Sequence, residues 1–230
     1  MGLLIEDESL RDRHHVFRDR THAGRLLAEK LGDYRGTETL VLAIPSGGVP
    51  VAAQMSRMLA AEMDIVVVRK LQIPFNPEAG FGAVAADGDV IFNEELLTHL
   101  DLSEDAVNVQ IEKAMAAVKR RERLFRKGKP YPSLAGRTVI VVDDGLASGY
   151  TMLAAIRFLR KRSPNRTIVA VPTGSEKTIR KIMDEVDELV CLNVRSGVSF
   201  AVAHAYKNWY DLTEEEVLTL LGEGGTAPAK

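Results

Sequence analysis

The sequence is poor in features that mark several classes of protein. Its 230 residues contain one cysteine, which excludes a disulfide framework and a zinc site built from several cysteines. No apolar run reaches the roughly 18–20 residues of a membrane span, and the acidic first twelve residues show no signal peptide. These absences predict a soluble, cytoplasmic protein without a membrane partner.

The chain also lacks an excess of charge of either sign. Lys and Arg number 30 against 32 for Asp and Glu, which gives a net charge of -2. This balance provides no bulk attraction to nucleic acid, so a nucleic-acid partner is not expected. Any anion that the protein binds must therefore be held by local geometry. The five histidines show no metal-ligand spacing, although His204 lies near a candidate site described below.

Short apolar runs rich in Val, Ile and Leu alternate with helical patterns, which is typical of parallel strands covered on both faces. The expected strands are 40–44, 64–68, 138–142, 167–171 and 188–192, and the expected helices are 19–31, 49–61, 149–161 and 175–185. This order predicts an α/β fold with a doubly wound, mainly parallel sheet. In such sheets ligands bind beyond the carboxyl ends of the strands.

Two segments interrupt the alternation. Residues 71–88 are rich in Pro and Gly, which predicts that most of them form a loop, with a hairpin around Asp87-Gly88. Residues 103–127 have helical spacing of apolar side chains and predict one long amphipathic helix. There is no internal repeat or strong linker, so we expect a single domain over 1–230, with its core at about 17–210 and a frayed tail at 222–230.

The strongest functional signal lies in Thr138 to Met152, TVIVVDDGLASGYTM. A buried strand ends in Asp143 and Asp144, and a short loop then enters a helix. Free N–H groups and the helix dipole favour an anion at such a helix start, and Gly149 allows a close approach of the backbone. Phosphate on one side and acceptors for sugar hydroxyls on the other indicate a 5-phosphoribosyl group. An ordinary capped turn and a Walker B strand are the alternatives, but no Walker A loop is present.

This segment resembles the 5-phosphoribosyl-1-pyrophosphate (PRPP) signature of type I phosphoribosyltransferases. The resemblance implies their fold, with a flexible lid loop and a small hood. It implies that Asp143 and Asp144 act in catalysis and bind Mg²⁺, directly or through water. The residues that it implies for the 5-phosphate are Ala147, Ser148, Gly149, Tyr150 and Thr151.

Two weaker segments resemble the pyrophosphate site of the same family. The loop after the first strand contains Ser46, Gly47 and Gly48, whose backbone N–H groups would face the leaving group. Arg69 and Lys70 follow the second strand, where the family places a basic pair that contacts pyrophosphate, and Lys70 is also a catalytic candidate. A Gly-Gly turn or a solvated basic pair would be the plainer interpretation of either segment alone.

The acceptor site is less defined by the sequence. The hood candidate is Arg195 to Tyr210, in which Phe200 could stack on a base, although aromatic residues after a last strand often belong to the core. Ala147 stands where relatives that act on 6-oxopurines carry an Asp, which lowers the expectation of hypoxanthine or guanine transfer. Glu78 in the expected lid is a candidate for proton transfer or an ordinary surface acid. A basic run at 119–129 is a separate feature. It is expected to form a solvated helix face, and the alternative is a position near PRPP or at a subunit interface.

Together these residues predict a Mg²⁺-dependent phosphoribosyltransferase that transfers the 5-phosphoribosyl group from PRPP to a nitrogenous base and releases pyrophosphate. The resemblance also implies a homodimer. The alternative is a PRPP- or nucleotide-sensing regulator on the same fold without turnover, and a hydrolase that consumes PRPP is a third possibility. The basic pair and the lid favour an enzyme, because a sensor need not shield a cation-like transition state from water.

Overall fold

A parallel sheet of six strands forms the centre of the protein. The computed structural model describes residues 2–197 and 199–224, with the side chains of all but residues 77, 78, 223 and 224. All neighbouring strands of this sheet are parallel, in the order β1-β9-β8-β7-β2-β3. Their bounds are β1 Leu3–Glu6, β2 Thr39–Ala43, β3 Glu62–Ile65, β7 Thr138–Val142, β8 Arg166–Ser175 and β9 Glu188–Arg195.

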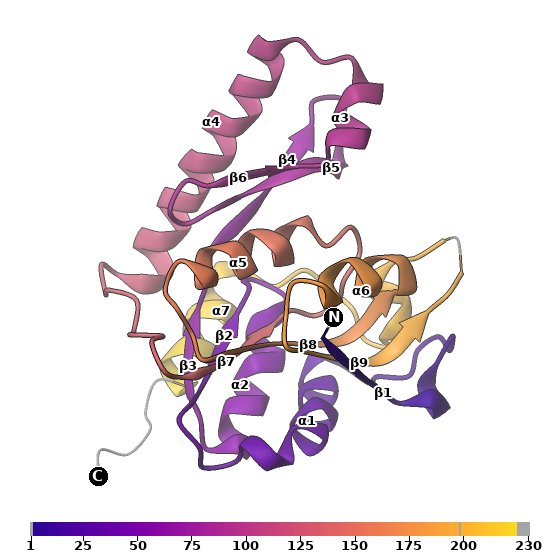
Figure 1. Ribbon diagram of the computed structural model, residues 1–230, viewed down its shortest axis with the longest axis vertical. Helices are drawn as coiled ribbons and strands as arrows, with labels where there is room; N and C mark the ends of the chain where they lie inside the picture. The colour runs from indigo at the N-terminus through magenta and orange to yellow at the C-terminus, as the bar shows by residue number, and fades with distance from the viewer. Residues whose placement is uncertain (1, 198, 225–230) are drawn as a thin grey trace.

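Helices cover both faces of this sheet (Figure 1). One face packs on α1 (Arg20–Lys30), α2 (Gly48–Leu59) and α7 (Glu214–Gly224), and the other on α5 (Tyr150–Arg160) and α6 (Glu176–Met183). Strand residues alternate between the two cores, as Ile140 faces one and Val141 the other. The predicted doubly wound α/β fold is therefore confirmed, with a mostly parallel central sheet.

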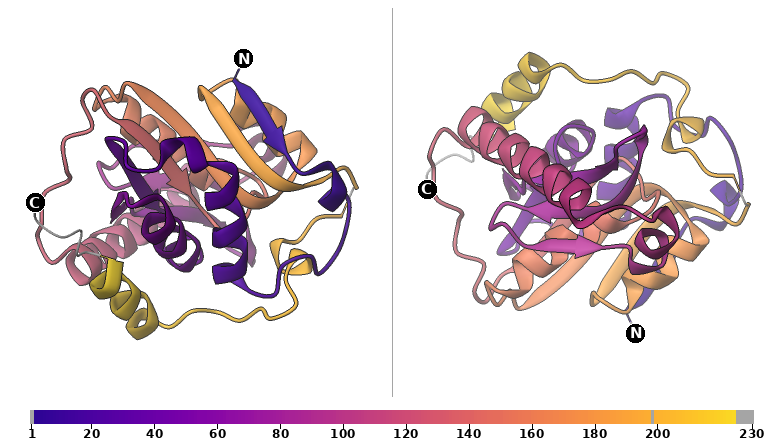
Figure 2. Two further views of the ribbon diagram at one scale, coloured as in Figure 1. Left: turned by 90° about the horizontal axis from the view of Figure 1, so that it is seen from below. Right: turned by 90° about the horizontal axis from the view of Figure 1, so that it is seen from above.

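A second, antiparallel sheet forms what we call the upper lobe, at the top of Figure 1. It consists of β4 (Val68–Ile73), β5 (Asn76–Ala85) and β6 (Val90–Phe92), with α3 (Glu94–Leu100) and α4 (Glu104–Arg121), and a π-helical turn (Glu122–Arg126) continues α4. The view from above in Figure 2 shows α4 crossing this sheet. The predicted long helix is thus confirmed as α4 and its continuation, and the hairpin as β5 and β6, with Asp87-Gly88 in the connecting turn.

The prediction that most of residues 71–88 form a loop is wrong. β4 pairs with β5 along most of this segment, and Pro74 and Phe75 form the turn between them. Small residues make this pairing possible: a Cβ on Gly80 would lie 2.3 Å from Cγ of Lys70, and one on Gly82 would lie 2.3 Å from the carbonyl oxygen of Ile91. The glycines that suggested a loop therefore serve close contacts within the upper lobe.

Other boundaries also differ from the expectation. The apolar run at 64–68 is divided, because the chain leaves the central sheet after Ile65 and enters the upper lobe at Val68. Strand β1 and helices α3 and α7 were not predicted. Helix α7 includes residues 222–224 of the expected tail, and the rest of that tail lies outside the described residues. In the part of the chain that the structure describes, no helix is long and apolar enough to cross a bilayer.

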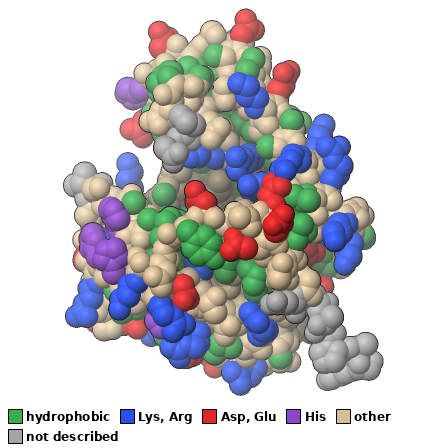
Figure 3. All heavy atoms as spheres, turned by 180° about the vertical axis from the view of Figure 1, so that it is seen from behind, with side chains coloured by type: hydrophobic (Ala, Val, Ile, Leu, Met, Phe, Trp, Pro, Cys, Tyr) green, Lys and Arg blue, Asp and Glu red, His purple; other side chains and the backbone are tan. Residues whose placement is uncertain are grey.

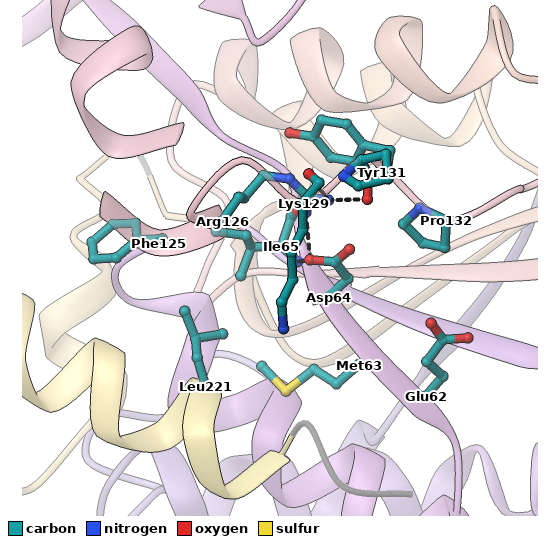
Figure 4. A pocket seen from close by; sticks show the side chains of 11 residues that line it. Glu62, Met63, Asp64, Ile65, Phe125, Arg126, Lys129, Tyr131, Pro132 and Leu221 are labelled. Carbon is teal, nitrogen blue, oxygen red and sulfur yellow. Dashed lines mark hydrogen bonds and ion pairs between the residues drawn. The ribbon is translucent and has the colours of Figure 1, made fainter. Parts of the chain in front are cut away.

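Arg126 fastens the end of the π-helical turn to the edge strand β3 (Figure 4). Its side chain is 2% exposed and is paired with Asp64. It also donates to the carbonyl oxygens of Ile65 at 3.2 Å and of Pro130 at 2.9 Å, and its guanidinium carbon lies 3.7 Å from the ring centroid of Tyr131. These groups border a cavity of 510 Å³ that contains none of the predicted site residues. We therefore assign Arg126 to the attachment of the upper lobe.

Replacement of Arg126 by alanine should destabilise the fold by about 2–4 kcal/mol, because it removes a buried cation and leaves carbonyl groups without donors. Chemical denaturation monitored by circular dichroism measures this change. Arg123→Ala is the matched control, since Arg123 lies in the same turn with an exposed side chain. Equal stability of the two variants would contradict the anchoring role.

Candidate functional site

The two adjacent acids lie at the carboxyl end of β7, near the middle of the sheet. The backbone N–H of Asp144 donates to Oδ1 of Asp143 at 2.8 Å. Burial raises the pKa of both carboxyl groups, and at Asp143 the charge of Asp144 raises it further. The guanidinium of Arg20 opposes the rise in the pKa of Asp144. Such a shielded pair favours a ligand that brings hydrogen-bond donors or positive charge.

Arg20, the first residue of α1, is the partner of Asp144. Its Nε donates to Oδ2 of Asp144 at 2.9 Å, in an ion pair whose side chains are 8% and 14% exposed. The hydroxyl of Tyr206 donates to the carbonyl oxygen of Asp144 at 2.7 Å. Nothing in the sequence indicated Arg20, and Tyr206 was predicted only as part of the hood candidate Arg195 to Tyr210. Asp19 caps α1 and could mark its start, but no local signal points to a partner 124 positions away.

The expected phosphate loop follows the acids and enters α5. Leu146 fixes it to β8, as its N–H donates to Thr173 at 2.9 Å and its carbonyl accepts from Ser175 at 3.1 Å. Gly149 has φ of 78°, a conformation that favours glycine, and a Cβ there would lie 2.5 Å from the methyl carbon of Thr178. No side chain caps α5. The first N–H groups of the helix are therefore available for an anion beside the predicted Ala147–Thr151.

The loop after β2 meets the acids directly. A Cβ on Gly47 would lie 1.9 Å from Oδ2 of Asp144, and one on Gly48 would lie 2.5 Å from the carbonyl oxygen of Val142. The peptide between Pro45 and Ser46 is cis. Because β2 and β7 are paired neighbours, their carboxyl ends bring the predicted Ser46–Gly48 loop against the predicted acids. The loop after β2 and the acids after β7 thus lie side by side.

One arginine of the upper lobe contacts this loop. Nη1 of Arg121, at the end of α4, donates to the carbonyl oxygen of Pro45 at 3.3 Å. Burial and the charge of nearby Arg69 lower the pKa of Arg121. Within the described residues neither arginine has a carboxylate within ion-pairing distance, although Arg121 feels the more distant charge of Glu214. Two converging arginines without an ion-paired acid are typical of an anion site.

Figure 3 shows a hollow between the upper lobe and the rest of the molecule, with Lys and Arg side chains along its upper wall and acidic ones on its lower wall. Arg69 and Lys70 are adjacent on β4, so their side chains point to opposite faces of that strand. Arg69 shares the face of Leu71, which packs in the same core as Val118 of α4. The structure thus brings together Arg69 and Arg121, of which Arg121 was predicted only as part of a basic run.

The hood candidates occupy different positions. Phe200 is half-buried, and Val202 packs on the loop, since a Cβ on Gly145 would lie 2.6 Å from its Cγ1. His204 stacks on His14 with ring centroids 5.5 Å apart and has an exposed side chain, as part of a surface cluster of histidines. Glu78 lies on β5, and its side chain is outside the described part of the structure.

The acids can contribute to a metal site but cannot form one alone. Within the described ranges, no group of three or more His, Cys, Asp and Glu side chains could hold a metal ion. Asp144 is paired with Arg20, which leaves Asp143 as the better protein ligand of the two. Mg²⁺ is commonly bound by one or two carboxylates together with water and substrate phosphates. The residues present therefore fit Mg²⁺ that arrives with a phosphorylated substrate.

The comparison with family models matches residues 18–207 to the phosphoribosyl transferase domain. The chain belongs to this family. The match covers the acids, both loops, Arg20 and Arg121. A Mycobacterium tuberculosis protein named "Putative phosphoribosyl transferase Rv0571c" is 38% identical over 208 residues, which are 90% of this chain and 46% of that protein. This phosphoribosyl transferase domain thus spans about half the length of the curated relative it matches.

A solved structure shares the fold of this phosphoribosyl transferase domain. It is the crystal structure of TT1426 from Thermus thermophilus, with 34% sequence identity and a TM-score of 0.73. The similarity covers 91% of this chain and 99% of TT1426. The predicted type I phosphoribosyltransferase relationship is thus confirmed at the level of family and fold.

Replacement of Gly47 by alanine should weaken PRPP binding at least about tenfold, because the added methyl group would displace the carboxylate of Asp144. Isothermal titration calorimetry measures this affinity. Gly32→Ala is the control, since a Cβ at Gly32 meets nothing within 4 Å. A Gly47→Ala variant with unchanged affinity would show that this contact is not part of the binding site.

Proposed function

We propose that this chain transfers the 5-phosphoribosyl group of PRPP to a nitrogenous base and releases pyrophosphate, with Mg²⁺ bound by the substrate and Asp143. The observation that carries the proposal is the meeting of three segments, because the glycine loop abuts Asp144 and Arg121 of the upper lobe donates to Pro45 before that loop. The acids at the end of β7, the glycine loop at the end of β2 and the arginines of the upper lobe each suit a different part of PRPP. Family membership supports the reaction class.

The three segments suggest how PRPP would lie. The 5-phosphate would accept hydrogen bonds from the N–H groups at the start of α5, with the hydroxyls of Ser148 and Thr151 nearby. The 2- and 3-hydroxyls would donate to Asp143 and Asp144. The pyrophosphate would lie between the Ser46–Gly48 loop and Arg69, with Arg121 beside it. This arrangement separates the two anionic ends of PRPP by a pair of acids that suit its neutral diol.

The reaction breaks the bond between ribose C1 and the pyrophosphate oxygen and forms a bond from C1 to a ring nitrogen of the base. The electron pair of the broken bond leaves with pyrophosphate, and the base loses the proton of the attacking nitrogen. Arg69 and Arg121 would stabilise the charge that develops on the leaving group. That Lys70, on the opposite face of β4, also contacts this group stays a prediction. Bound Mg²⁺ would supply further neutralisation of the pyrophosphate oxygens. The upper lobe would limit the access of water to the cation-like ribose.

The base is proposed to bind beneath residues 195–210, where half-buried Phe200 offers a surface for stacking. Ala147 supplies no acid to the base, which favours acceptors that need no carboxylate from this loop. Glu78 remains a candidate to accept the proton. A homodimer is the assembly that we propose.

The decisive experiment incubates the protein with PRPP and Mg²⁺ and a panel of purine and pyrimidine bases, and follows the release of pyrophosphate. Base-dependent release with formation of a nucleotide is expected. Tight binding of PRPP without release for any base would contradict the transferase and favour a sensor. Release without a base, with ribose 5-phosphate as product, would indicate a hydrolase.

Asp143→Asn should weaken binding of PRPP by about 1–3 kcal/mol, because an amide accepts the sugar hydroxyls and the cation less well than a carboxylate. Calorimetry with and without Mg²⁺ measures the loss, which should be larger with the metal. Asp33→Asn is the control, because Asp33 is an exposed carboxylate that belongs to none of the three segments of the proposed site. Identical affinities of both variants would place the sugar elsewhere.

Arg121→Gln should raise the dissociation constant of pyrophosphate about tenfold and that of ribose 5-phosphate less than twofold, because Arg121 faces the leaving-group loop. Competition with labelled PRPP measures both constants. Arg123→Gln removes an exposed arginine from the following turn and should change neither. Equal losses for the two ligands would assign Arg121 a structural role instead.

A further inference from the structure

The guanidinium of Arg20 makes three contacts. Its Nε donates to Oδ2 of Asp144 at 2.9 Å, and its Nη1 donates to the carbonyl oxygen of Tyr210 at 2.9 Å. Its guanidinium carbon lies 3.9 Å from the ring centroid of Trp209. The residue is only 7% exposed. A planar guanidinium can satisfy this combination of two hydrogen bonds and one stacked face, whereas a lysine ammonium cannot.

The partners of Arg20 belong to two different parts of the proposed site. Asp144 is the acid that would face the ribose, whereas Trp209 and Tyr210 end the segment that would cover the base. A second connection runs in parallel, because the hydroxyl of Tyr206 donates to the carbonyl oxygen of Asp144 at 2.7 Å. The rings of Tyr206 and Trp209 are 5.1 Å apart between centroids. The acid and the covering segment are thus joined by contiguous contacts.

Tyr206 is itself held firmly. It is 1% exposed, its ring packs on Phe17 at 5.6 Å between centroids, and its carbonyl oxygen is 2.8 Å from Nδ1 of His15. Trp209 is 37% exposed, so part of its ring faces solvent. The side of the indole that does not face solvent is therefore bordered by Arg20 and Tyr206. A displacement of the Arg20 guanidinium must change the surroundings of this ring.

We propose that Arg20 is a positioning residue that couples the ribose-binding carboxylate of Asp144 to the covering segment at Tyr206–Tyr210, so that occupation of the PRPP site is transmitted to Trp209. The coupling rests on the function proposed above. A ribose hydroxyl that donates to Asp144 competes with Arg20 for the same carboxylate. The guanidinium then shifts its contacts toward Tyr210 and Trp209, which adjusts the covering segment for the second substrate.

The chain has one tryptophan, so fluorescence excited selectively in the tryptophan absorption band, where tyrosine does not absorb, reports on Trp209 alone. Titration of the wild-type protein with PRPP and Mg²⁺ should give a saturable change in emission with the same midpoint as calorimetry. Arg20→Gln should lose most of this change even at saturating PRPP. An Arg20→Gln variant that binds PRPP and keeps the full change would overturn the coupling.

Steady-state kinetics test the same coupling without relying on fluorescence. Trp209→Leu removes the ring under the guanidinium and should raise the KM for PRPP several-fold, although Trp209 would not touch PRPP. Leu3→Ala is the control, because Leu3 is a 59% exposed apolar residue on β1 and belongs neither to the proposed site nor to the covering segment. Arg20→Lys keeps the charge and should recover only part of the affinity lost in Arg20→Gln, because an ammonium group has no planar face to stack on Trp209 while it bonds Asp144 and Tyr210.

A double-mutant cycle completes the test. If Arg20 and Trp209 act as one unit, Arg20→Gln with Trp209→Leu should raise the KM for PRPP hardly more than Arg20→Gln alone, whereas independent effects would multiply. Multiplicative effects would overturn the coupling. If Arg20→Gln fails to fold by circular dichroism, Arg20→Lys replaces it in the cycle.

The outcome also separates this inference from the proposed function. If the wild-type protein binds no PRPP by calorimetry, the proposed function fails and the coupling falls with it. If the wild-type protein binds PRPP and Trp209→Leu matches Leu3→Ala in KM, only the coupling is wrong.

Discussion

The placement of two adjacent carboxylates at a largely shielded strand end is the constraint on which the site depends. Both groups lose hydration there, which raises the pKa of each, and the charge of Asp144 raises the pKa of Asp143 further. The structure offsets this cost locally, with the buried guanidinium of Arg20 on Asp144 and a backbone N–H on Asp143. Asp144 is thereby held in place, while Asp143 keeps more of its capacity to bind a ligand. The neighbouring glycine loop can approach only because it has no side chain at the point of contact.

The charges of the protein are arranged in two layers that the net charge of -2 conceals. Figure 3 shows acidic side chains on the lower wall of the hollow and Lys and Arg side chains on its upper wall. Asp143 and Asp144 follow β7 of the central sheet, whereas the neighbouring Arg69 and Arg121 belong to β4 and α4. These layers come from separate sheets that are joined after β3. The position of the upper lobe therefore determines the distance between the two kinds of charge. Contacts that fix this lobe, such as those of Arg126, support the site without touching it.

The sequence predicted what depends on neighbours along the chain. Asp143, Asp144 and the loop to Thr151 are contiguous, so the strand, the turn and the helix start were all visible in fifteen residues. Glycine misled the prediction at Gly80 and Gly82, because close strand pairing and loop flexibility both favour a residue without a side chain. Arg20 and Arg121 could not be placed, since their partners lie 124 and 76 positions away and depend on packing of the whole fold.

The attachment of Arg126 to β3 has a consequence for self-association. β3 is an edge strand, and edge strands offer free backbone groups to another chain. The guanidinium of Arg126 already occupies the carbonyl oxygen of Ile65 at this edge, and the side chain of Asp64 accepts from the N–H of Ile65. Glu62 adds a further exposed charge beside them. The residue that fastens the upper lobe thus also leaves fewer free backbone groups at the edge of β3.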